Sequence, residues 1–226
     1  MSAGAARMPQ PGVAADCGEG SARLPRGGPR LLRLHLASRR VPAALAVVAT
    51  CALALRIALH WHWDTYGALQ LPLVFEAASA TVIAVATANP FGEPERATGR
   101  WLPFLRLGAT VALAVTAAGA LAAAGTGAHL AGGTLDVLRN VAGLAGIGLL
   151  CAAVLGGGLA WAGPVGYLVV AVYALYTDWH GPALTTPWIW PARPPHDVGA
   201  AICAGLVFAA GIAVITVRGA RDPAGE

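Results

Sequence analysis

The chain has 226 residues, of which 57% are hydrophobic and only 12% are charged, and its mean hydropathy is +0.63. Soluble domains average about 45–50% apolar and about 25% charged residues. This composition therefore excludes an ordinary soluble globule, and it also excludes a chain that is disordered over most of its length. It predicts an all-α, polytopic membrane protein.

All 15 basic residues are arginine, and the chain has no lysine. A phosphate-binding P-loop needs a lysine, so the chain is not itself a P-loop ATPase, and we expect neither a cofactor nor an enzyme active site. The formal net charge of +4 does not predict a nucleic-acid partner. Seven of the arginines lie in the first 40 residues and most of the others flank apolar runs, which indicates membrane topology and not a binding stripe.

Six apolar runs follow a polar leader. Residues 1–27 are rich in turn formers and predict a disordered cytoplasmic tail, and residues 28–40 predict an interfacial segment. At about 1.5 Å per residue, about 20 residues cross a hydrocarbon core of about 30 Å. We expect a transmembrane domain at 41–217, with a cytoplasmic tail at 218–226 and spans at about 41–59, 69–88, 107–124, 137–156, 159–176 and 198–217.

Arginine counting gives the orientation. If the N-terminus is cytoplasmic, the outer side holds only Arg139 and Arg193, whereas the cytoplasmic side holds Arg7, Arg23, Arg26, Arg30, Arg33, Arg39, Arg40, Arg96, Arg100, Arg106, Arg218 and Arg221. This excess is the positive-inside pattern. It predicts a multi-pass protein of the plasma membrane with both termini in the cytoplasm.

Two ionisable residues interrupt the first two runs. Arg56 lies near the outer end of the first run and Glu76 lies at a similar depth in the second. Because an ionisable group is costly in a membrane, we expect the two to form an intramembrane polar pair. Two interpretations stay open: a polar point on a substrate or proton path, and a structural pair or an arginine that extends to the headgroups.

Most of the histidines fall in the outer loops, beside aspartates. Imidazole and carboxylate groups bind zinc or copper, so the candidate metal ligands are His60, His62, Asp64, His180 and His196. Their spacing is not characteristic of a metal site, and the alternative is plain interfacial polarity. A membrane-surface hydrolase is a further alternative, although the chain has neither HExxH nor GxSxG.

The fourth run opens with Asp136, Arg139 and Asn140, and it contains several glycines. The spacing of the first two predicts a local i, i+3 ion pair. In lipid, glycines let neighbouring helices approach closely. The outer loop 177–197 contains five prolines and cannot be helical throughout. It predicts a short re-entrant element whose backbone is buried in protein.

The inner loop 89–106 mixes charged and aromatic side chains, which suits docking onto a partner. Its candidate docking residues are Phe91, Glu93, Glu95, Arg96, Arg100 and Trp101. The alternative is a solvated loop whose aromatic side chains rest on the membrane surface.

Over residues 28–217, this arrangement resembles the permeases of type-2 ABC exporters. The resemblance implies that loop 89–106 carries a coupling helix for a separate ATPase, that 177–197 is re-entrant and that 28–40 is an interfacial helix. The chain also resembles small actinobacterial integral membrane proteins.

We therefore expect a membrane-spanning permease subunit of an ABC-type export system. Its partners would be the lipid bilayer, a separate ATP-binding subunit, and a second copy or a second permease. The alternatives are a membrane scaffold or sensor, and a membrane enzyme that uses outer-face histidines and aspartates.

Overall fold

The computed structural model describes residues 41–61, 65–87, 102–127, 130, 132–176 and 187–218. Within these ranges the chain is helical and has no strand. Six helices are long and apolar enough to cross a membrane, which confirms the predicted all-α fold and the six predicted runs. The predicted tail at 1–27, the interfacial segment at 28–40 and residues 219–226 lie outside the described ranges.

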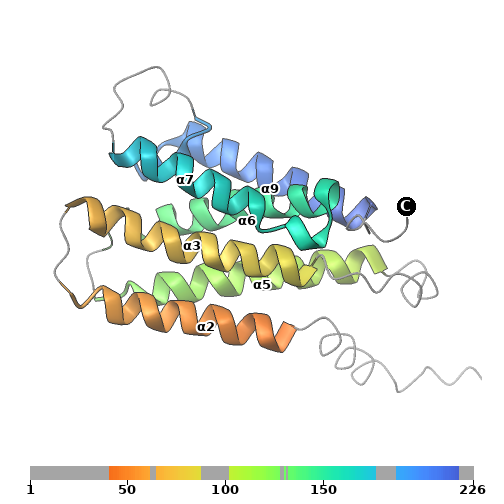
Figure 1. The fold of residues 1–226 in the computed structure, drawn as a ribbon, viewed down its shortest axis with the longest axis horizontal. Helices are drawn as coiled ribbons and strands as arrows, with labels where there is room; N and C mark the ends of the chain where they lie inside the picture. The colour runs from red at the N-terminus through yellow and green to blue at the C-terminus, as the bar shows by residue number, and fades with distance from the viewer. Residues whose placement is uncertain are drawn as a thin grey trace, which may run out of the picture.

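The six helices lie side by side along the long axis of the molecule (Figure 1). They are α2 (Val41–Ala58), α3 (Thr65–Thr87), α5 (Leu102–Ala124), α6 (Gly133–Leu155), α7 (Ala162–Tyr176) and α9 (Val198–Arg218). Two short 3₁₀ helices, η2 (Gly157–Leu159) and η3 (Trp190–Ala192), lie in the connections. The helices α3, α5 and α6 begin about one turn before the apolar runs from which they were predicted. A helix can extend beyond the apolar residues that predict it.

Inside an apolar bundle, each backbone polar group needs a partner from its own helix. Most of the described threonine hydroxyls also bond within the chain's own helical turns, since they donate to carbonyl groups three or four residues earlier; Thr81, for example, donates to the Ala77 carbonyl at 2.8 Å. Gly156 ends α6 with a φ of 93°, a backbone conformation that favours glycine. The chain then turns through η2 into α7.

The centre of the bundle is α6, which contacts α3, α5, α7 and α9. In its apolar stretch 61% of the residues are buried, against 17% in α2. A Cβ on Gly146 would lie 2.6 Å from the backbone nitrogen of Phe208 in α9, and a Cβ on Gly148 would lie 2.6 Å from the Cβ of Ala84 in α3. The expected role of these glycines in close helix packing is thus confirmed.

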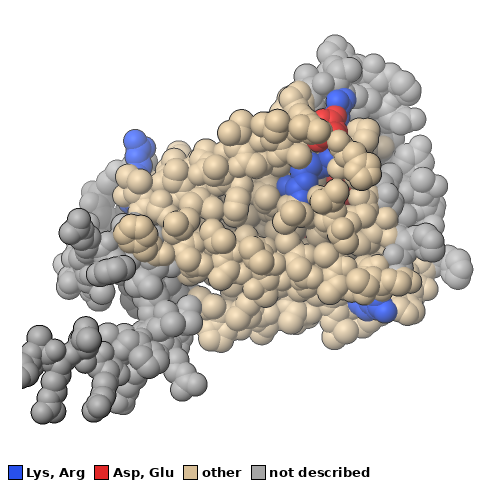
Figure 2. All heavy atoms as spheres, turned by 180° about the vertical axis from the view of Figure 1, so that it is seen from behind, with Lys and Arg blue, Asp and Glu red and all other residues tan. Residues whose placement is uncertain are grey.

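The outer faces of the helices are apolar. Leu53, Val115, Val169 and Leu206 lie on four different helices and are 62–65% exposed. On the face shown in Figure 2, charged side chains gather toward the two ends of the bundle and leave the surface between them without charge. An exposed apolar surface of this kind suits contact with lipid chains.

Candidate functional site

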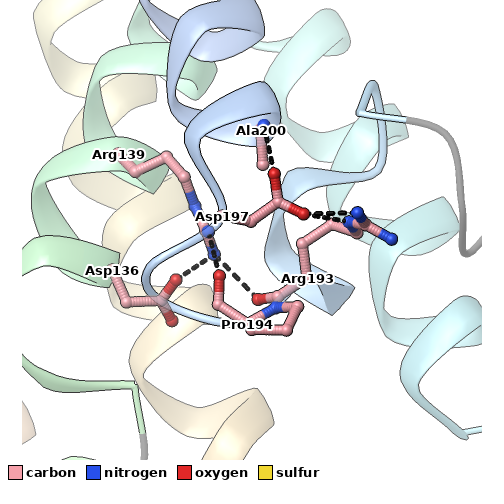
Figure 3. Close-up of polar contacts among 6 residues, drawn as sticks. All are labelled: Asp136, Arg139, Arg193, Pro194, Asp197 and Ala200. Carbon is pink, nitrogen blue, oxygen red and sulfur yellow. Dashed lines mark hydrogen bonds and ion pairs between the residues drawn. The ribbon is translucent and has the colours of Figure 1, made fainter.

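One end of the bundle is organised around Arg139, and we call it the Arg139 end. Here α6 and α9 begin and the segment 187–197 lies against them. The Arg139 guanidinium pairs with the Asp136 carboxylate, which confirms the predicted i, i+3 pair. It also donates to the carbonyl groups of Pro194 at 2.9 Å and of Arg193 at 3.2 Å (Figure 3). The Arg139 side chain is only 3% exposed, so one buried cation fastens the segment 187–197 to α6.

A second ion pair orders the start of α9. The Arg193 Nε donates to Asp197 Oδ2 at 2.6 Å, and the backbone nitrogen of Ala200 donates to Asp197 Oδ1 at 3.0 Å (Figure 3). Asp197 therefore caps the N-terminus of α9. The hydrogen bond from Ala200, together with the Arg193 guanidinium, holds the pKa of this carboxyl below its usual range.

Trp190 anchors the same segment inside the bundle. Its side chain is 2% exposed and stacks on the Tyr167 ring, with 4.5 Å between the ring centroids. The Tyr167 hydroxyl donates to the Trp188 carbonyl at 2.8 Å. Gly143 makes room for the indole, because a Cβ there would lie 2.6 Å from Cε2 of Trp190. The described part of the predicted re-entrant loop thus lies against α6, α7 and α9, with the Trp190 indole buried.

Deeper in the bundle, α3 and α6 bring two polar side chains together. Glu76 is 1% exposed and Asn140 is 3% exposed, and the Asn140 amide donates a hydrogen bond to the Glu76 carboxyl. Glu76 Oε2 and Asn140 Oδ1 are buried and have no hydrogen-bond partner among the described residues. The hydroxyl of Ser79, one turn further along α3, is also buried without a described partner. These side chains form a polar site, which we call the Glu76 site, in otherwise apolar helices.

Arg56 has a different set of contacts. Its Nη1 donates to the carbonyl of Ala124 at 3.2 Å and also to that of Thr126, where α5 ends. Free carbonyl groups at a helix C-terminus attract a cation. Arg56 and Glu76, predicted as a pair, therefore have separate partners in the described part of the chain.

Two of the five candidate metal ligands lie in the described residues, and they have different surroundings. His60 Nδ1 lies 2.9 Å from the backbone oxygen of Arg56, whereas His196 lines an apolar hollow of about 580 Å³ between α6 and α9. His62, Asp64 and His180 lie outside the described residues. Among the residues that are described, no three His, Cys, Asp or Glu side chains form a group that could hold a metal ion.

All the candidate docking residues of the inner loop also lie outside the described ranges, namely Phe91, Glu93, Glu95, Arg96, Arg100 and Trp101. Sequence reasoning missed the part played by Asn140 in the Glu76 site and that of Trp190 in the bundle. The available signal for Asn140 was its position as an amide at the start of a long apolar run. A buried amide needs a hydrogen-bond partner, and the neighbouring helices contain few polar side chains that could provide one.

A scan against protein-family models found no match for the chain, and neither a search of curated proteins nor a search of solved structures found a similar protein.

Proposed function

We propose that the chain is the membrane-spanning subunit of a transport system and that the Glu76 site lies on its transport path. The observation that carries the proposal is the burial of Glu76 among apolar helices. Ionisable residues inside membrane spans are costly, and they commonly mark substrate or proton pathways. The competing explanation is a structural ion pair, which requires a cation. The nearby Arg139 is already bound to Asp136 and to two backbone carbonyls, so a structural pair does not account for Glu76.

The energy source in this proposal is a separate ATP-binding subunit, as in an ABC-type export system. The absence of lysine supports a separate subunit, because a P-loop requires that residue. The end of α3 and the start of α5 lie at the end of the bundle opposite the Arg139 end (Figure 1), and the predicted docking loop 89–106 covers the connection between them and the first turn of α5. A partner bound there would leave the segment 187–197 free on the other side of the membrane. With both termini cytoplasmic, the subunit would work in the plasma membrane as a homodimer or beside a second permease.

Co-purification tests the ATP-binding partner. The full chain, carrying an affinity tag, is expressed in its native organism and extracted in mild detergent. We expect a P-loop ATPase, identified by mass spectrometry, to co-purify with an ATP hydrolysis activity that follows it through gel filtration. The size of that complex also shows whether one or two permease chains are present.

A charge reversal locates the contact. The double variant Glu95→Arg/Arg96→Glu inverts neighbouring charges in the candidate docking loop, and we expect it to reduce the recovered ATPase at least tenfold. Arg221→Glu, in the C-terminal tail on the same predicted side, is the matched control and should retain the ATPase. Recovery of the membrane protein without any P-loop protein contradicts the proposed system. An ATPase that tolerates the double reversal contradicts the docking loop.

A further inference from the structure

The Glu76 site contains two buried acceptor atoms for which the described residues provide no donor. In the ionised state a carboxylate only accepts hydrogen bonds, and an amide oxygen does so as well. The Asn140 amide nitrogen supplies the hydrogen bond that the two groups share. It leaves Glu76 Oε2 and Asn140 Oδ1 without a partner among the described residues. Two acceptors cannot form a hydrogen bond with each other, so the site with an ionised Glu76 is short of one hydrogen-bond donor.

The described residues around Glu76 do not supply a cation for its ionised form. The charges that act on its carboxyl are those of Asp136 and Arg139, both on α6, and these two form an ion pair with each other. Arg56 on α2 is bound to the carbonyl groups that end α5. The other described titratable side chains on helices packed against α3 are Cys51, Arg106, Cys151, Tyr167 and Tyr173.

One proton removes both difficulties. A proton on Glu76 Oε2 turns that atom into a donor, which then bonds to Asn140 Oδ1 while the amide nitrogen bonds to the other carboxyl oxygen. The result is a closed carboxyl–amide pair with two hydrogen bonds and no net charge. Buried polar groups are tolerated when they are hydrogen-bonded and neutral, whereas an unpaired buried charge is very costly.

We propose that Glu76 is a proton-binding site, at which the side chain is held as a neutral acid by Asn140 at neutral pH. The step is a simple exchange, in which a carboxylate and one proton give a carboxylic acid, and it needs no further reactant. Its physiological use rests on the proposed transport function, since a proton carried at this position would be the transported or coupled ion.

Infrared spectroscopy of the purified full chain in lipid tests the protonation state directly. A protonated carboxyl has a carbonyl stretching band that a carboxylate lacks. We expect this band at pH 7 in the unmodified protein and its complete loss in Glu76→Gln, which keeps the size and hydrogen-bonding capacity of the side chain. Asp197→Asn removes a partly buried acid that is ionised in its pair with Arg193, and it is the matched control that should keep the band. Asn140→Ala should shift the band to higher frequency, because the acid loses its amide partner.

Isotope labelling makes the test independent of the variants. Glu76 is the only glutamate in the described ranges, so labelling glutamate with ¹³C should move the same band to lower frequency in the unmodified protein. Absence of the band at pH 7, or a band that neither the label nor Glu76→Gln changes, overturns the proposal. The result is independent of the ATPase experiment: a co-purifying ATPase without the band removes the proton site alone, and the band without an ATPase leaves it in place.

Discussion

Arg139 joins a helix to a loop by contacts that only an arginine makes. Its planar guanidinium binds the Asp136 carboxylate and, at the same time, the carbonyl groups of Pro194 and Arg193. A lysine carries the same charge on a single compact ammonium group and cannot reproduce this fork. The segment 187–197 therefore depends on the shape of the side chain as well as on its charge.

We predict that Arg139→Ala lowers the free energy of unfolding by about 3 kcal/mol, because it removes one partner of a buried ion pair and leaves Asp136 and two carbonyl groups unsatisfied. Arg139→Lys should fall between this variant and the unmodified protein. The measurement is thermal or denaturant unfolding in detergent. Arg218→Ala removes an exposed arginine at the end of α9 and should change stability by less than about 0.5 kcal/mol. Equal effects at positions 139 and 218 would contradict the fastening role of Arg139.

At the scale of the helix, the sequence predicts how deep a residue lies in the membrane better than it predicts on which face of the helix its side chain lies. The pair of Asp136 and Arg139 was predicted because both residues lie on one helix, where i, i+3 spacing fixes their contact. Glu76 and Arg56 were matched by depth alone. The neighbour of Glu76 is instead Asn140, 64 residues further along the chain, because α6 occupies the centre of the bundle. Apolar runs show little about which face of each helix turns toward that centre.

The packing of α6 against α9 yields a prediction for the two helices together. We expect Gly146→Ala to cost about 1–3 kcal/mol, since the new Cβ would lie 2.6 Å from backbone atoms of α9 that cannot move independently of their helix. Gly205→Ala, on α9 itself, meets nothing within 4 Å and should be neutral or stabilising by up to about 1 kcal/mol through helix propensity. Unfolding in detergent compares the two. Matching losses of stability would show that α6 and α9 do not approach each other this closely.

At the scale of the whole molecule, charge and apolar surface are separated along the helix axes. Of the arginines described at the Arg139 end, Arg139 and Arg193 each have an aspartate partner nearby in the sequence, and Arg56 binds the carbonyl groups that end α5. Because Arg139 and Arg193 have structural roles in these ion pairs, their presence at an end that is predicted to face outward is explained. The positive-inside rule is a statement about the arginines that remain near the ends of the spans; of those predicted to be cytoplasmic, the described ones, Arg106 and Arg218, lie toward the opposite end of the bundle.

This separation makes the orientation testable with two cysteine probes. In a chain whose four native cysteines are replaced, His196→Cys puts a thiol at an exposed position of the Arg139 end, and Thr98→Cys puts one in the loop between α3 and α5. We expect a membrane-impermeant maleimide to label position 196 in intact cells, and to label position 98 only after the membrane is opened. Labelling of position 98 alone in intact cells would invert the topology. A docking loop for a cytoplasmic ATPase would then be on the wrong side of the membrane, whereas the Glu76 site, which is defined by contacts within the bundle, would be unaffected.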